Sequence, residues 1–119
     1  MERIYTLNYQ GKAILFCNYE GLRGNELLAT LKTATQQTLA AQNEELLILA
    51  NFTDTYTNKE VMDYLTGPES KAATRNTKKI AVVGITGLKK MFFNVYNTVS
   101  QTKAYAFETL EAAKDYLVA

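Results

Sequence analysis

Residues 82–93, VVGITGLKKMFF, place two glycines and two lysines between an apolar run and an aromatic run. If these runs are a strand and a helix, the first amides of the helix can hold a phosphate or a carboxylate. The glycines would let a ligand approach the backbone, the threonine would donate its hydroxyl, and the lysines would neutralise charge. The candidate anion-binding residues are therefore Gly84, Thr86, Gly87, Lys89 and Lys90. The spacing matches neither the P-loop nor the dinucleotide fingerprint, so a tight corner without a ligand is the alternative reading.

A second cluster of polar groups follows the apolar run LLILANF, where four hydroxyls flank one acid in the segment TDTYT, residues 53–57. Open α/β sheets bind ligands beyond the carboxyl ends of their strands, so the location favours a function. Thr55 and Thr57 are the candidate phospho-acceptors, and a phosphate on Thr57 would lie at a helix N-terminus. The alternative is structural, because Thr57 and Glu60 have the spacing of a capping box.

Residues for catalysis or metal binding are scarce. The chain has no histidine, which removes the commonest general base and the commonest metal ligand. Cys17 is the single cysteine, and its apolar surroundings predict a small buried side chain and not a nucleophile. Tyrosine, lysine and aspartate could still act in a reaction. We expect no enzyme activity, no catalytic residue, no metal site and no cofactor.

The helix expected over residues 88–100 has more aromatic residues than one buried face needs. Its predicted buried face carries Leu88, Met91 or Phe92, Val95 and Val99. Phe93 and Tyr96 then fall partly off that face, so they are the candidate surface for a partner protein or a homodimer. A wide buried face under the last helix is the alternative.

A further alternative is a small-ligand binding protein for a lipid-like or phosphate-containing molecule. Met62, Met91, Phe92 and Phe93 would then line an apolar pocket. A chain of this length has little room for such a pocket unless a dimer or a moving helix supplies a wall.

Hydrophobic periodicity predicts the order β-β-α-β-α-β-α-β-α for the elements that must position these residues. A hairpin turns at Gln10-Gly11, a helix capped by Asn25 follows, and Thr57 caps the next helix. Gly67 ends that helix with Pro68 starting another turn, or the helix continues with a kink. Strands that alternate with helices predict a mixed, mostly parallel five-stranded sheet with four main helices.

Composition limits the class of protein. The 119 residues are 47% hydrophobic and 21% charged, which predicts one globular domain over residues 1–119. A net charge of +1 gives no field to attract nucleic acid. No apolar run approaches the roughly 20 residues that span a bilayer, and the N-terminus lacks the layout of a signal peptide. We expect a cytoplasmic protein with no membrane insertion.

The element order resembles the STAS domain of bacterial anti-sigma-factor antagonists, and more closely the small bacterial STAS/CRAL-TRIO-like proteins. The resemblance rests on NYEGLRGNELLATLK, LLILANFTDTYTNKEVMDYL, KKIAVVGITGLKKMFFNVYN and AFETLEAAKDYLV, which cover most of the chain. It implies a regulatory, protein-binding module that responds to an anion or to phosphorylation near the second and third helix N-termini. In the antagonists a phosphorylated serine lies in an Asp-Ser-Ser-Gly run. Here that run is absent, Asn51 replaces the first acid, and Thr57 and Asn58 lie near the acceptor position.

Overall fold

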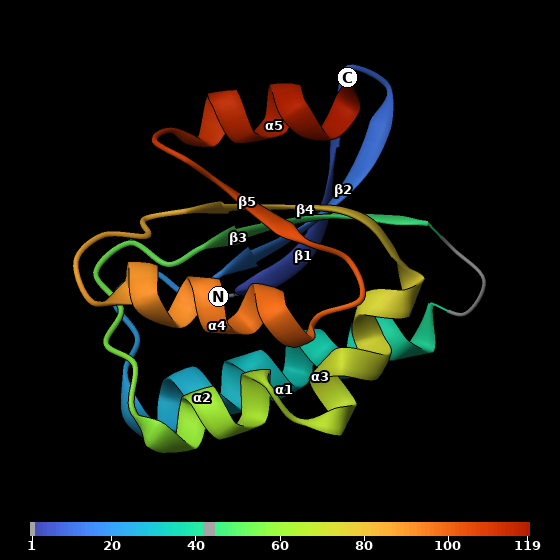
Figure 1. Ribbon diagram of the computed structural model, residues 1–119. Coiled ribbons are helices and arrows are strands. Elements are labelled where there is room, and N and C mark those ends of the chain that lie inside the picture. Colours follow the sequence, from blue (N-terminus) through green and yellow to red (C-terminus); the bar gives the residue numbers. More distant parts are fainter. Residues whose placement is uncertain (1, 42–44) are drawn as a thin grey trace.

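The computed structural model describes residues 2–41 and 45–119, and in it a single five-stranded sheet separates two layers of helices (Figure 1). The strands are β1 (Ile4–Tyr9), β2 (Lys12–Asn18), β3 (Leu46–Asn51), β4 (Thr77–Val83) and β5 (Ala104–Phe107). The helices are α1 (Gly24–Ala40), α2 (Lys59–Leu65), α3 (Pro68–Ala73), the 3-10 turn η1 (Thr74–Asn76), α4 (Lys89–Val99) and α5 (Leu110–Val118). The predicted order is confirmed, and α3 is the extra turn that Pro68 starts.

The sheet has the spatial order β1-β2-β3-β4-β5, with β1 antiparallel to β2 and every other pair parallel. The hairpin turns at Gln10 and Gly11, whose φ angles of 49° and 82° are both positive. Positive φ at both central residues is the requirement of the type I′ turn that matches the twist of a two-residue hairpin. The predicted mixed, mostly parallel sheet is therefore confirmed.

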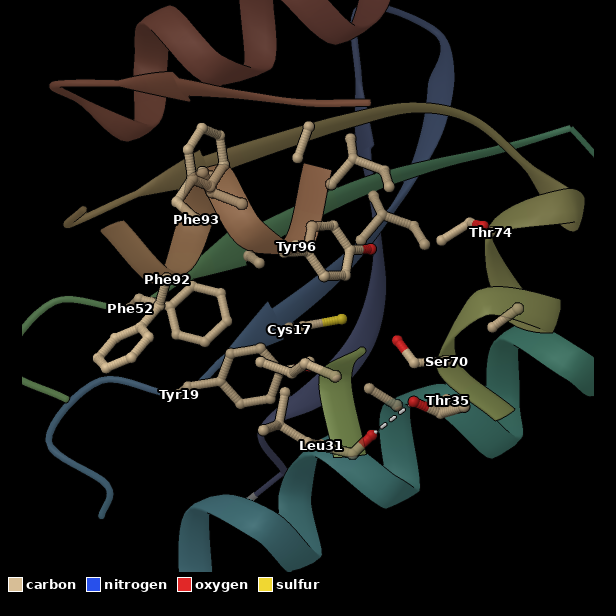
Figure 2. A pocket seen from close by; sticks show the side chains of 18 of the residues that line it. Cys17, Tyr19, Leu31, Thr35, Phe52, Ser70, Thr74, Phe92, Phe93 and Tyr96 are labelled. Atoms are coloured by element: carbon tan, nitrogen blue, oxygen red, sulfur yellow. Dashed lines mark hydrogen bonds between the residues drawn. The ribbon is translucent and has the colours of Figure 1, made fainter. Parts of the chain in front are cut away.

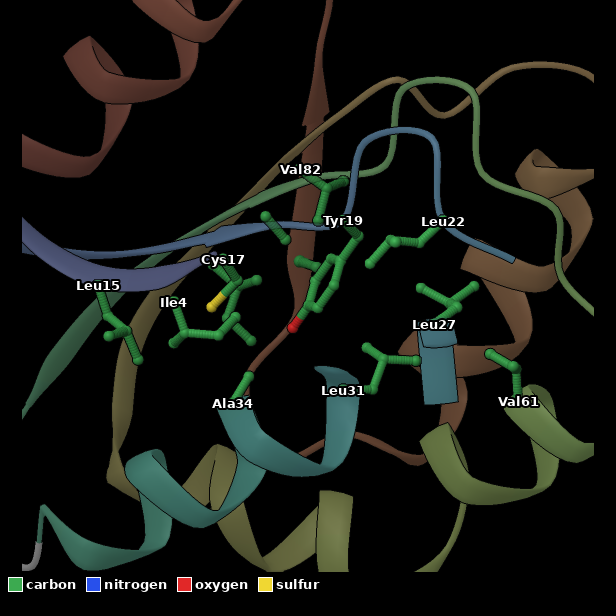
Figure 3. Close-up of a cluster of buried hydrophobic side chains, with 13 residues drawn as sticks. Ile4, Leu15, Cys17, Tyr19, Leu22, Leu27, Leu31, Ala34, Val61 and Val82 are labelled. Atoms are coloured by element: carbon green, nitrogen blue, oxygen red, sulfur yellow. The ribbon is translucent and has the colours of Figure 1, made fainter. Parts of the chain in front are cut away.

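The two faces of the sheet carry different cores. On one face α5 packs alone, burying Ala113 and Leu117 against Ile14, Leu49 and their neighbours. On the other face α1 to α4 lie together, and Leu27 and Leu31 of α1 reach toward the sheet (Figure 3). Within the described residues, no helix is long and apolar enough to cross a membrane.

Two predicted helix caps are wrong by one or two residues. Helix α1 begins at Gly24 after an extended Arg23, so Asn25 lies inside the helix and caps nothing. Helix α2 is capped by Asn58, whose side-chain oxygen accepts a hydrogen bond from the amide of Val61 at 2.9 Å. Thr57 precedes that cap, so the capping box predicted for it does not form. Asparagine caps helices at least as well as threonine, so the shift by one residue carries no penalty in capping.

The predicted inward face of α4 is wrong in part, because Phe92 and Val99 are half-buried but the other residues are not. Leu88, Met91 and Val95, expected to be buried, are 73%, 61% and 45% exposed. The helix instead turns Phe93 and Tyr96 toward the core of the sheet. The two side chains expected on the surface are thus half-buried in this structure.

Candidate ligand cavity

A cavity of about 140 Å³ lies between the sheet and the helices α1 to α4 (Figure 2). The space is partly open to solvent, so it is a pocket and not a sealed internal void. Its walls come from all four of these helices, from strands β2 to β5 and from the two loops before α2 and α4. The lining side chains are mainly apolar, including Leu31, Ile48, Phe52, Met62, Leu65, Ile80, Val82, Ile85, Phe92 and Phe93.

The cavity arises because small side chains stand where larger ones would fill it. Ala34 of α1, Ala50 of β3, Ala73 of α3 and Ala104 of β5 all line the space. Each is buried, with 8% or less of its surface exposed, so the sequence places methyl groups at four central positions of the wall. Helix α4 lies over the remaining side, but none of its residues is fully buried and the space stays partly open to solvent. This helix therefore covers the cavity without filling it.

The aromatic residues of α4 form one wall. Phe92, Phe93 and Tyr96 line the cavity, and Figure 2 shows Phe92 near Tyr19 and Phe52, with the Phe93 ring directed away from them. Tyr19 and Phe52 stack on each other with ring centroids 4.9 Å apart. The predicted apolar pocket residues Met62, Phe92 and Phe93 are thus brought together. Met91 is not, because it lies on the exposed side of α4.

Three groups in the wall that could become anions, those of Cys17, Tyr19 and Tyr96, are held neutral by burial. Burial raises the pKa of the Cys17 thiol to about 12, and burial raises the pKa of Tyr96 to about 12. Burial also raises the pKa of Tyr19 well above its usual value. All three groups keep their protons at neutral pH, so the interior side of the cavity offers hydroxyl and thiol groups and no negative charge.

Lys89 is the charged residue that lines the cavity. Its ammonium donates a hydrogen bond to the carbonyl oxygen of Phe52 at 2.8 Å, which ties the start of α4 to the loop after β3. Burial lowers the pKa of this lysine, and the charge of Asp54 partly opposes the shift. Because the ammonium already has a carbonyl partner, its first role here is to anchor α4.

The other candidate anion-binding residues lie in or next to the turn that connects β4 to the start of α4. Gly84 has a φ of 86°, and a Cβ at this position would lie 2.4 Å from the backbone nitrogen of Thr53, so two loops touch here. Gly87 has a φ of 57° and open space around it. Thr86, Gly87 and Lys90 are exposed. The amides of Lys89 and Lys90 donate to the carbonyls of Thr86 and Gly87, at 3.1 Å in both cases, so two of the amides expected to bind an anion already have partners.

The candidate phospho-acceptors have different surroundings. Thr55 is 3% exposed, and its hydroxyl donates to the carbonyl of Phe52 at 2.8 Å, so a modifying enzyme would have to open this loop to reach it. Thr57 is half-buried and lines the cavity. Asn51 is buried as well, and its amide donates to the side-chain oxygen of Asn18, so it joins strands β2 and β3. Phosphorylation at either threonine stays a prediction.

Ser70 is a cavity residue that sequence reasoning missed. It lies in α3 between Glu69 and Lys71, and no pattern in that short segment marks it. Its helix is placed by Pro68 at the first position, where a proline fits because that amide needs no helical partner. The position of Ser70 opposite β4 and α4 is set by tertiary packing, and only the structure reveals it.

No protein-family model matches the chain, and no curated protein matches it. Among solved structures, the chain is similar to an uncharacterized protein of the DUF3478 family with a SpoIIAA-like fold from Shewanella loihica PV-4. The two are 21% identical, with a TM-score of 0.71 over 96% of this chain and 91% of that one. At this identity the likeness concerns the fold. The chain has the SpoIIAA-like fold, which is the STAS fold of the anti-sigma-factor antagonists.

Proposed function

We propose that this chain is a binding protein for a small, mostly apolar molecule that occupies the cavity beneath α4. The observation that supports this function is the cavity itself, a space of about 140 Å³ with apolar walls inside an otherwise packed domain. A cavity of about 150 Å³ lined by Leu, Ile and Phe side chains remains dry and binds benzene. The volume here suits a molecule of similar size, or the end of a longer chain.

Helix α4 provides the means of entry. Its side chains Leu88, Met91 and Val95 face outward, none of its residues is fully buried, and its N-terminus is held by the bond from Lys89 to Phe52. The absence of fully buried side chains in this helix favours its local opening. A ligand can therefore enter by displacement of α4 without disruption of the sheet.

Toluene is the probe that tests this function. We expect toluene to raise the midpoint of thermal unfolding, because a ligand at ten times its Kd stabilises the native state by about 1.4 kcal/mol. The matched variant is Ala50→Ile, which fills part of the cavity from the centre of β3 and should abolish the effect. If toluene shifts the midpoint of both proteins equally, or of neither, the cavity is not a binding site.

The partner-binding module is the second candidate, and the observation that favours it is the fold shared with a SpoIIAA-like protein. Sedimentation velocity tests its simplest form, a homodimer of the 13.4 kDa chain. A dimer that persists at micromolar concentration would support it. A monomer throughout that range would remove the homodimer and leave the ligand-binding function as the better-supported one.

A further inference from the structure

Ser70 has a hydroxyl at a buried position of the cavity wall. The residue is 6% exposed, yet its side chain makes no hydrogen bond to the residues drawn around it, and its oxygen points into the cavity (Figure 2). Among the described residues, no side-chain nitrogen or oxygen that is wholly enclosed lacks a partner. The Ser70 oxygen therefore borders open space, and that space is the cavity.

Four threonines of the same wall differ from Ser70 because their hydroxyls are already used, whereas no hydrogen bond among the described residues engages the hydroxyl of the fifth, Thr57. These four donate to backbone carbonyls three or four residues earlier in the chain: Thr35 to Leu31 at 3.0 Å, Thr38 to Ala34 at 2.9 Å, Thr74 to Lys71 at 2.7 Å and Thr77 to Ala73 at 3.3 Å. These hydroxyls present mainly their methyl groups to a ligand. A serine hydroxyl without such a bond can both donate and accept.

Tyr96 presents a second hydroxyl from the opposite wall. Figure 2 shows the phenol of this α4 residue directed into the interior, toward the side of the cavity where Ser70 and Thr74 lie. The phenol keeps its proton at neutral pH, because burial raises its pKa to about 12. Neither hydroxyl carries a charge, and the ammonium of Lys89 is bound to the Phe52 carbonyl. The polar groups of this region match an uncharged partner.

We propose that the ligand of this cavity is a small uncharged molecule, with an apolar ring or short chain and one hydroxyl or carbonyl group that Ser70 binds. This inference rests on the proposed function and names the ligand class. The apolar body would pack against Phe92 and Ile80, and the polar group would complete the hydrogen bonding of Ser70. A long-chain lipid would fit only in part, because the cavity is close in size to one that holds benzene.

Phenol and toluene separate this inference from the proposed function. The two molecules have nearly the same shape, but phenol must give up its hydrogen bonds to water on entering the cavity. In a wall without a free polar group phenol would bind more weakly than toluene, since its hydroxyl would be left unpaired. In the wild-type protein we expect phenol to bind at least as tightly as toluene, with both Kd values measured by amide chemical-shift titration.

Ser70→Ala is the decisive variant, and Thr35→Val is its matched control. Removing the Ser70 hydroxyl should weaken phenol binding roughly three- to tenfold, while toluene changes less than twofold. Thr35 also lines the cavity, but its hydroxyl donates to the carbonyl of Leu31, so Thr35→Val should leave the ratio of the two Kd values unchanged. Benzoate, as the anionic probe, should bind more weakly than phenol.

The outcomes distinguish the two ideas. If neither toluene nor phenol binds, the proposed function fails and this inference fails with it. If toluene binds but wild-type protein prefers it clearly over phenol, only the inference about Ser70 is overturned. Tighter binding of benzoate, lost in Lys89→Met, would place the polar group of the ligand at Lys89 and would also overturn it. The wild-type comparison holds even if Ser70→Ala does not fold.

Discussion

The pair of substitutions Ala50→Ile and Ala81→Ile tests whether the space beneath α4 exists in solution. Both alanines are buried on neighbouring central strands, with 7% and 0% of their surface exposed. Ala50 faces the cavity, whereas Ala81 faces α5 and packs within the cluster that contains Ala113 and Leu117. The same chemical change is thus made toward a void and toward a filled core.

The expected effects have opposite signs. Ala50→Ile adds three carbons, and burying each gains about 0.8 kcal/mol, for a total of about 2.4 kcal/mol. Fixing the isoleucine side chain costs about 0.5 to 1 kcal/mol, which leaves a gain of about 1.5 kcal/mol. Ala81→Ile instead forces the same atoms into a packed region, which destabilises by about 1 to 3 kcal/mol.

Urea unfolding followed by far-UV circular dichroism measures both changes, and thermal unfolding gives a second readout. For a domain of this length, a gain of about 1.5 kcal/mol corresponds to a rise of roughly 6 °C in Tm. If Ala50→Ile destabilises as much as Ala81→Ile, the space beneath α4 is closed in solution. The cavity, the proposed function and the inference about Ser70 would then lose their common basis.

Further predictions concern the loops, one helix cap and the pH dependence of stability. Gly84→Ala should lower the free energy of unfolding in urea by about 3 kcal/mol or more, because the new Cβ would lie 2.4 Å from the backbone nitrogen of Thr53. Gly87→Ala places its Cβ in open space and should lower the free energy of unfolding by only about 1 to 2 kcal/mol, which is the strain of a positive φ. Asn58→Ala removes the observed cap of α2 and should lower the free energy of unfolding by about 1 kcal/mol, while Thr57→Ala should lower it by less than about half as much. A larger loss for Thr57→Ala than for Asn58→Ala would show that Thr57 is the cap, as predicted from the sequence. Burial raises the pKa of Cys17 from 9.0 to about 12 in the folded state, so the thiol loses its proton first in the unfolded chain. The free energy of unfolding should therefore decline as the pH rises from about 9 to about 12. A decline of the same size in Cys17→Ala would refute the assignment to this thiol.

The order of elements was predictable because each signal is local. The turn at Gln10-Gly11 lies between two apolar runs, and the pattern of Ala113 and Leu117 places one face of α5 on the sheet. Period-two and period-3.6 patterns require only neighbouring residues. The parallel sheet then follows, because alternating strands and helices have few other ways to pack.

The cap of α2 shows where local signals stop being sufficient. Thr57 and Asn58 are adjacent, both residue types cap helices, and the spacing of Thr57 to Glu60 matches a capping box. The choice between them depends on where the loop from β3 delivers the chain, and therefore on contacts far away in sequence. Because Asn58 is the cap, Thr57 precedes the helix and lines the cavity, a position that no local pattern in the sequence predicts.

Helix α4 misled the sequence reasoning for a related reason. Apolar side chains occur around most of its circumference, so both the stripe through Leu88, Met91 and Val95 and the stripe through Phe93 and Tyr96 have helical spacing. Hydrophobicity alone cannot rank two such stripes. The sheet selects the aromatic stripe, which leaves three large apolar residues exposed on the outer side.

The cavity could not be located from the sequence, because it results from small side chains in four elements that are far apart along the chain. Its energetic cost nevertheless supports a use. At about 24 cal/mol per Å³, a fully enclosed void of 140 Å³ would correspond to about 3.4 kcal/mol of lost stability, and the partial opening of this pocket to solvent makes the loss smaller here. Typical domains have a total of only about 5 to 15 kcal/mol. One larger side chain at Ala50 would recover part of this loss, so an empty cavity with four alanines in its wall is a poor solution for stability alone. A bound molecule would restore the missing contacts, and Ser70 would then have the hydrogen-bond partner that the surrounding side chains do not supply.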